Sequence, residues 1–274
     1  GPTVTTVSTT STNIVIDKNG NPEGLLKSPM AVGSYTGDGT DNRPITGVGF
    51  QPDLVIVKTH VWARYAVFRT STMTGDSTSF FANGVANAAN YIQALLADGF
   101  EVGTDQAVNA SGQTYHWMAF RDNGAGDFKV GSYLGNGADN RDITGLGFTP
   151  DMAVIKPNST EGRATWRITA NSGDQAMDFS FNSEVTNLIQ GFVSDGFQVG
   201  SSVSANSNGT TYWYFAFKAA AGFMAQGSYS GDNTDNRNIT GVGFQPDLVW
   251  IKGTVYGING ALRPSTITGD LSLL

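Results

Sequence analysis

The sequence predicts an all-β protein made of tandem β-sandwich domains, each about 97 residues long. Three observations predict this fold class. Glycine accounts for 35 of the 274 residues and is accompanied by many Thr, Ser and Asn, which is typical of strands joined by tight turns. Apolar residues occur in short runs and alternating patterns of strand length. The chain also repeats itself, with a period that is too long for a solenoid and fits one sandwich domain.

A Gly-Ser-Tyr motif marks the repeat at Gly33, Gly131 and Gly227, spaced by 98 and 96 residues. The third copy contains only the first half of the pattern, so we expect either a longer array or partial ends that complete a sandwich between neighbouring chains. This register predicts a tail over residues 1–27 with one strand (Asn13–Asp17) from a preceding or partner repeat, a first sandwich over 28–125, a second over 126–221 and a partial third over 222–274.

Within the first repeat we expect about seven strands. Leu54–Lys58 is a continuous apolar run after a Pro-Asp turn signal, which is typical of a strand buried on both faces. Thr114–Phe120 alternates large side chains, and we favour core on both of its faces over a sugar-stacking platform. The Ala-rich stretch Asn87–Leu96 is the one candidate for a single short helix or turn. The expected strands are Ala31–Tyr35, Arg43–Gly47, Leu54–Lys58, Tyr65–Arg69, Ser79–Phe81, Gly99–Gly103 and Thr114–Phe120.

Charge and composition argue against several classes of function. The net charge is −7, and no cluster of Lys and Arg offers the basic surface that nucleic acid requires. No apolar run approaches the roughly 18–20 residues of a membrane span. Cysteine is absent and histidine occurs twice, so thiolate sites and His-rich metal sites are not expected. We also expect no enzyme, because no Glu recurs between the repeats as a paired catalytic carboxylate would.

Four longer motifs carry a family resemblance. They are Gly-Ser-Tyr-x-Gly-(Asp/Asn), Ile-Thr-Gly-x-Gly-Phe-Gln-Pro-Asp-Leu-Val-Trp-Ile-Lys, Asp-Gly-Phe-x-Val-Gly and an aromatic Tyr-x-(Trp/Tyr)-x-Ala-Phe strand. Together they resemble a domain of phage tail and other virion proteins and repeats of large bacterial surface proteins. The resemblance covers roughly residues 28–274. It implies a concanavalin-like (lectin/glucanase-type) jelly-roll sandwich and supplies no catalytic residues.

A polar loop follows each Gly-Ser-Tyr motif and gives the candidate binding residues. Its carboxylate and amide oxygens are ligands that hard cations prefer, so a structural Ca²⁺ at Asp38, Asp41, Asp232 and Asp235 is one interpretation. The other, which we favour, is a turn shaped by its own side chains. Trp62 is a further candidate for contact with a sugar. The candidate ligand-binding residues are Trp62, Asp38, Asp41, Asn42, Asp139, Asn140, Asp235 and Asn236.

Recurring charged residues give the structural candidates. We expect bidentate Arg–carboxylate clamps between strands, with a sugar-binding groove as the alternative. At the end of the buried strand, Lys58, Lys156 and Lys252 should reach water, with an isopeptide crosslink as the sharper alternative. The expected clamp residues are Arg43, Arg69, Asp76, Arg141, Arg167, Asp174, Arg237, Arg263 and Asp270.

These observations favour a non-enzymatic structural or adhesive repeat array, extracellular on a virion (as in a tail fibre) or on a bacterial cell surface. Cell-surface glycans or other copies of the chain are the expected partners, with neither nucleic acid nor membrane insertion. Apart from the structural Ca²⁺, no cofactor is expected. Two alternatives remain open: a lectin-like carbohydrate-binding module, and a filament subunit that assembles by strand complementation.

Overall fold

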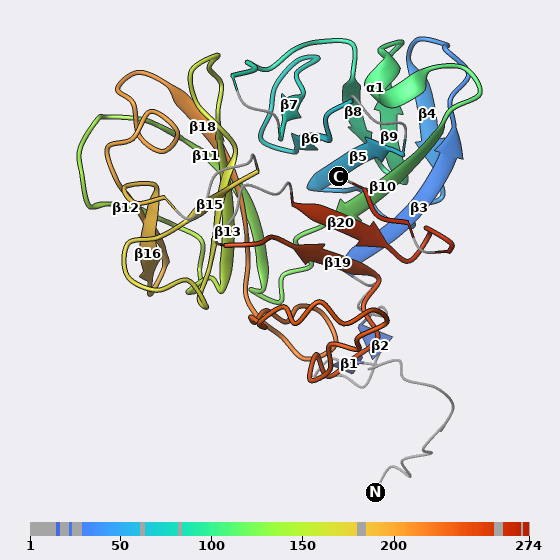
Figure 1. The fold of residues 1–274 in the computed structure, drawn as a ribbon. Coiled ribbons are helices and arrows are strands. Elements are labelled where there is room, and N and C mark those ends of the chain that lie inside the picture. Colours follow the sequence, from blue (N-terminus) through green and yellow to red (C-terminus); the bar gives the residue numbers. More distant parts are fainter. Residues whose placement is uncertain are drawn as a thin grey trace, which may run out of the picture.

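The computed structural model of the chain describes residues 15–16, 22–23, 29–60, 64–81, 84–179, 185–254, 260–269 and 271–273. These residues form antiparallel sheets and one short helix, which confirms the prediction of an all-β sandwich protein. In Figure 1 one sandwich, coloured blue to green, lies beside a second, coloured yellow-green to orange, and a red hairpin lies next to both.

The first sandwich has two layers. Its five-stranded sheet contains, in spatial order, β3 (Met30–Thr36), β10 (Thr114–Phe120), β5 (Leu54–Thr59), β6 (Val67–Thr70) and β7 (Ser79–Phe80). Its three-stranded sheet contains β4 (Arg43–Thr46), β9 (Gly99–Val102) and β8 (Ile92–Leu96). Apolar side chains from both sheets, among them Val55, Phe100 and Trp117, fill the space between them and form the first sandwich core.

The second sandwich has the same strand order. Its larger sheet contains β11 (Phe128–Leu134), β18 (Thr211–Phe217), β13 (Met152–Pro157), β14 (Thr165–Ile168) and β15 (Met177–Asp178). Its smaller sheet contains β12 (Arg141–Thr144), β17 (Gly196–Val199) and β16 (Ile189–Val193). A separate set of apolar residues, among them Ile155, Phe197 and Tyr214, forms the second sandwich core.

The third copy of the repeat contributes one hairpin, β19 (Leu248–Ile251) with β20 (Ala261–Pro264). No strand is formed between residues 225 and 247, although that stretch carries the motifs that become strands in the first two copies. Near the N-terminus β1 (Val15–Ile16) pairs with β2 (Pro22–Glu23). The rest of the expected tail strand, Asn13–Asp17, lies outside the described residues.

A third apolar cluster, here called the common core, lies between the two sandwiches. Strand alternation explains how it forms: Val55 and Val57 of β5 point into the first sandwich core, whereas Leu54 and Ile56 point into the common core. Every residue of β5 is buried, which confirms the expected strand with two buried faces. The buried residues of the common core are Leu54, Ile56, Phe68, Met73, Phe81, Met118, Phe120, Phe128, Met152, Val154, Ala164, Trp166, Met177, Phe215 and Phe217.

The stretch Asn87–Leu96, expected to form a short helix or a turn, forms no helix, and that part of the prediction was wrong. Residues Ile92–Leu96 form β8, which pairs with β9 and carries an irregularity between Ile92 and Ala94. The pairing with β9 and the burial of Ile92 outweigh the helix propensity of the alanines. The helix that the described residues do form is α1 (Gln106–Asn109), whose N-cap Asp105 accepts a hydrogen bond from the amide of Ala107.

Candidate functional site

The polar loop after β3 is closed by its own side chains. Asp38 Oδ1 accepts hydrogen bonds from the amide and the hydroxyl of Thr40, at 2.8 and 2.7 Å, and its Oδ2 lies 3.1 Å from Nε of Arg43. The bonds from Thr40, aided by the Arg43 charge, hold the pKa of Asp38 below its ordinary value. Asn42 adopts a left-handed conformation with φ of 53°. These contacts match the interpretation that we favoured, in which the loop is a turn shaped by its own side chains.

A buried asparagine that we did not predict holds this loop from beneath. Asn109, at the end of α1, is fully buried. Its Oδ1 accepts hydrogen bonds from the amide of Asp38 and from Arg43, at 3.0 and 3.1 Å, and its Nδ2 donates to Thr40 O at 2.7 Å. The sequence held a signal for it, because Asn206 stands at the corresponding place of the second repeat, 97 residues later.

The second loop repeats this arrangement. Asn206 is fully buried, and its Oδ1 accepts from the amide of Asn136 and from Arg141, at 3.1 and 3.0 Å. Arg141 also lies over the ring of Tyr133, 5.5 Å from its centroid, as Arg43 lies over Tyr35. Arg43 and Arg141 therefore each bind the buried asparagine of their repeat and lie over a tyrosine ring. Each also donates to an exposed backbone carbonyl, Thr36 O or Leu134 O.

The outer carboxylates of the first two loops accept bonds from glutamines. Gln93 donates to Asp41 at 3.0 Å, and Gln190 donates to Asp139 at 2.9 Å. In the third loop, Asp235 instead accepts from the amide and the side chain of Asn236. Asn140 and Asn236 share the left-handed conformation of Asn42. Throughout the part of the chain that the structure describes, no three His, Asp or Glu side chains are grouped as a metal site would need.

Arg69, Arg167 and Arg263 each donate hydrogen bonds to backbone carbonyl oxygens of the loop that follows their strand, a role that the expected carboxylate clamps did not include. Arg69 donates to the carbonyl oxygens of Ser77 and Gly75, at 2.5 and 2.6 Å, and so holds the loop after β6. Arg167 donates in the same way to the carbonyls of Gln175 and Gly173, and Arg263 to those of Leu271 and Gly269. Because the guanidinium is planar with several donors, it can satisfy several carbonyls of a turn at once.

The aspartates expected in these clamps hold a different loop. Asp76 Oδ2 accepts from the amide of Asn90 at 2.8 Å, and Asp174 Oδ2 accepts from the amide of Asn187 at 3.1 Å. Each bond fixes the start of the hairpin formed by β8 or β16. Asp270 lies outside the described residues.

The expectation that the lysines reach water was wrong for the first two repeats. Lys58 is 4% exposed and Lys156 is fully buried. Lys156 Nζ donates to the carbonyl oxygens of Pro157 and of Val85 in the first sandwich, at 2.7 and 2.8 Å. Its burial lowers its pKa to about 8. Here the lysine joins two sandwiches through carbonyl oxygens.

The aromatic strands are buried on both faces, as we favoured from the sequence. Tyr115 and Trp117 of β10 belong to the first sandwich core, and Met118 and Phe120 belong to the common core. Within the same strand, Nδ1 of His116 lies 2.9 Å from the hydroxyl oxygen of Thr266 in the partial third repeat, whose described residues 224–254 and 260–269 are here called the third segment. Trp62 lies outside the described residues.

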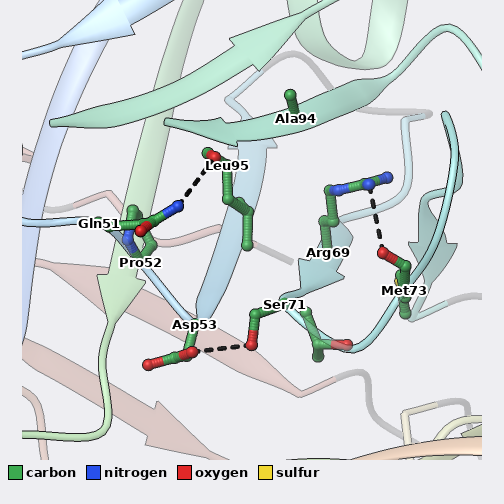
Figure 2. Close-up of a pocket in the computed structure, with 9 residues that line it drawn as sticks. Gln51, Pro52, Asp53, Arg69, Ser71, Met73, Ala94 and Leu95 are labelled. Carbon is green, nitrogen blue, oxygen red and sulfur yellow. Dashed lines mark hydrogen bonds between the residues drawn. The ribbon is translucent and has the colours of Figure 1, made fainter. Parts of the chain in front are cut away.

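A shallow pocket at the edge of the first sandwich gathers Gln51, Asp53, Arg69, Ser71 and neighbouring residues (Figure 2). Its polar groups bind one another or nearby backbone. Asp53 accepts from the Ser71 hydroxyl at 2.7 Å and from the amide of Asp122 at 2.8 Å. The same Ser–Asp bond recurs in the third segment between Ser265 and Asp247, which indicates a structural role.

The comparisons with known proteins are sparse. A family model described as "Domain of unknown function (DUF7483)" matches residues 28–124, about a third of the chain and the stretch that forms the first sandwich. No curated protein and no solved structure matches the chain. Among the described residues, no helix has the length and apolar character needed to cross a membrane.

Proposed function

We propose that this chain is a non-enzymatic structural and adhesive module of an extracellular repeat array, exposed on a virion (as in a tail fibre) or on a bacterial cell surface. The observation that carries the proposal is the common core. Apolar side chains of both sandwiches meet there, so the repeats are joined through their interiors as well as through the chain. Such coupling suits a part that must transmit force or hold a fixed shape.

Aromatic contacts supply much of this coupling. The ring of Phe217 in the second sandwich lies 5.2 Å from that of Phe120 in the first, and Phe68 lies 5.6 Å from Phe215, both in edge-to-face geometry. Trp250 of the third segment lies 6.0 Å from Phe81 and 5.3 Å from Trp166, so it contacts both sandwiches. Each buried aromatic pair adds about 0.5–1.5 kcal/mol beyond the area that it buries.

Hydrogen bonds between the sandwiches add directional contacts to this apolar interface. The amide of Asn87 donates to Asn158 Oδ1 at 2.9 Å, and the amide of Gly84 donates to Gly162 O at 3.3 Å. Together with the bond from Lys156 to Val85, they fix one register between the two sandwiches. A fixed register favours a stiff unit over domains that move independently.

The adhesive part of the proposal rests on the polar loops. Asp41, Asp139 and Asp235 are exposed and stand at equivalent positions of the three repeats. Their carboxylates can accept hydrogen bonds from sugar hydroxyls, and repeated weak sites raise avidity by about 10²–10⁴ when they bind together. Cell-surface glycans are the partners that we propose for these loops.

Two measurements test the proposal. In calorimetry the common core should make the sandwiches unfold in one cooperative transition, with equal calorimetric and van't Hoff enthalpies. Two independent transitions would contradict the stiff unit. On a glycan array, binding should weaken stepwise in Asp41→Ala and Asp139→Ala, with Asp142→Ala on β12 as the control. If the chain binds no glycan on the array, the adhesive part of the proposed function is wrong.

A further inference from the structure

We propose that Asn123, in the linker that joins the two sandwiches, is a self-modification site: the folded chain accelerates the loss of its side-chain amide, with water as the co-reactant. This first linker, residues 121–127, runs from the end of β10 to the start of β11. Its consecutive residues supply the groups that such a reaction needs, which are a nucleophile, a base, an electrophile and a hydrogen-bond donor for the oxygen that gains charge.

The nucleophile is the main-chain nitrogen of Gly124, and a base lies next to it. The amide of Gly124 donates to Asp122 Oδ1 at 2.9 Å. Other contacts hold Asp122 in this place, because its amide donates to Asp53 Oδ2 at 2.8 Å and its Oδ2 lies 3.2 Å from Lys129 Nζ. A carboxylate that already accepts a hydrogen bond from the attacking N–H is placed to take its proton.

The electrophile is the side-chain carbonyl of Asn123. Its Oδ1 accepts a hydrogen bond from the amide of Ala125 at 3.0 Å, and this donor stabilises the negative charge that the oxygen gains during the attack. Gly124 has no side chain to obstruct the attack, and its surroundings are open, since an added Cβ would meet nothing within 4 Å. Because the two reacting groups belong to neighbouring residues, no second molecule has to be bound before the ring closes.

The reaction balances with one water molecule. The nitrogen of Gly124 forms a bond to Cγ of Asn123 as its proton passes to Asp122. The bond from Cγ to Nδ2 then breaks, and Nδ2 takes that proton and leaves as ammonia. Water opens the resulting five-membered imide at one of its two carbonyl carbons, which gives either an aspartyl residue or an iso-aspartyl link through the side chain. Nothing is oxidised or reduced.

The two other Asn-Gly pairs of which the structure describes both residues have no carboxylate at the glycine nitrogen. The amide of Gly137 donates to Asn206 O at 2.7 Å, and the amide of Gly209 donates to Gly135 O at 3.0 Å. A main-chain carbonyl accepts the hydrogen bond but carries no charge with which to take the proton. The asparagines of these pairs, at 136 and 208, are therefore internal references within the same molecule.

The second linker, residues 218–223, shows that the fold does not require these side chains. The amide of Ala219 donates to Asp151 Oδ2 at 2.8 Å, which anchors this linker as the first linker is anchored. Ala220 follows at the place of Asn123. The fold thus closes the second linker with alanine side chains, and the reactive groups of the first linker need a reason other than folding.

The conversion changes the chain where the sandwiches are coupled. Phe120 and Phe128 flank the first linker, and both belong to the common core, with ring centroids 5.8 Å apart. The iso-aspartyl product lengthens the main chain between them by one carbon, and both products add a negative charge. Burial and the charge of Asp122 already raise the pKa of Asp127, so a further carboxylate beside it is unfavourable. We expect the converted linker to weaken the common core.

The test follows the full chain during incubation near neutral pH, by proteolysis and mass spectrometry of the three Asn-Gly peptides. In the folded chain, conversion at Asn123 should be at least about tenfold faster than at Asn136 or Asn208. In urea the three rates should approach one another, because each pair then lies in a flexible chain. Conversion at Asn123 should also be slower in urea than in the folded chain, which distinguishes a reaction that the structure accelerates.

A matched pair of variants isolates the base. Asp122→Asn keeps an oxygen that can accept the Gly124 N–H but removes the charge that takes the proton, so conversion at Asn123 should slow at least about tenfold. Lys129→Ala removes a surface ion pair with Asp122 and should leave this rate within about threefold of the wild type. Equal rates at Asn123 and Asn208 in the folded chain, or an unchanged rate in Asp122→Asn, would overturn the inference.

The effect on the sandwiches is measured on the incubated chain. Wild type that has been converted fully should melt about 2–4 °C below fresh protein. Asn123→Ala, which gives the first linker the residue that the second linker carries at Ala220, should melt at the same temperature before and after the same incubation. Converted wild type that melts like fresh protein would contradict the expected effect on the common core.

Discussion

Lys156 of the second sandwich donates a hydrogen bond from Nζ to the carbonyl oxygen of Val85 in the first, at 2.8 Å. Val85 packs against the first sandwich core. The bond therefore joins a side chain of the second repeat to a backbone carbonyl that lies next to the core of the first. An ammonium at this place is removed from water, which lowers its pKa to about 8. The contact between the sandwiches should therefore respond to pH.

Replacing Lys156 with Met should change how stability depends on pH. The unfolded chain holds a proton on this amine up to its ordinary pKa of 10.5, whereas the folded chain releases it above about pH 8. Between these values the unfolded state binds more protons, so this group makes the free energy of unfolding rise with pH, by about 3 kcal/mol in all. Denaturant titrations from pH 7.5 to pH 9.5 cover roughly the first half of the interval between these two pKa values. They should show the rise in the wild type and not in Lys156→Met. Lys218→Met, at an exposed position, should keep it.

Asn109→Ala should destabilise the first sandwich by about 1–3 kcal/mol, because it removes the hydrogen bonds that a fully buried amide makes to the loop. Hydrogen exchange should speed up at the amide of Asp38, which donates to the lost oxygen. The exposed Asn208 provides the control, and Asn208→Ala should change stability by less than about 0.5 kcal/mol. Equal effects of the two changes would argue against the clamp.

Phe217→Ala should weaken the common core by about 3–5 kcal/mol, since this ring contacts Phe120, Phe128 and Phe223. We expect the single calorimetric transition to broaden or split as the two sandwiches uncouple. Phe244→Ala in the third segment removes the same ring from a half-buried place and should cost under about 1.5 kcal/mol. A sharp single transition in Phe217→Ala would show that the coupling lies elsewhere.

Calcium should leave the melting temperature unchanged. A ligand that binds only the folded state raises stability in proportion to RT ln(1 + [L]/Kd), so even weak binding becomes visible at high concentration. The oxygens of Asp38 are taken by Thr40 and Arg43, so we expect no such rise and no fall with a chelator. A rise that disappears in Asp38→Asn would restore the calcium interpretation.

Much of the first sandwich could be predicted from the sequence because its strands carry clear signals. The continuous apolar run from Leu54 requires two buried faces, and the structure provides two cores for them. The buried lysines could not be placed in this way. A lysine that ends such a strand usually reaches water, whereas Lys156 donates to Pro157 O of its own strand and to Val85 O of the neighbouring sandwich, contacts that no local sequence signal announces.

The third repeat shows most directly what a local sequence leaves undecided. Arg43-Pro44-Ile45-Thr46 is strand β4, whereas Arg237-Asn238-Ile239-Thr240 forms no strand. The residues are similar, and the difference is that β9 pairs with the first and no described strand pairs with the second. Strand formation in this fold therefore depends on the partner more than on the propensity of the segment.

Because the common core takes one face from each larger sheet and is also contacted by Leu248 and Trp250, it is enclosed from three directions. The third repeat is therefore joined to both sandwiches through one shared interior. A change of volume in any of the three repeats should disturb the packing of the other two, so their sequences should vary together at these positions.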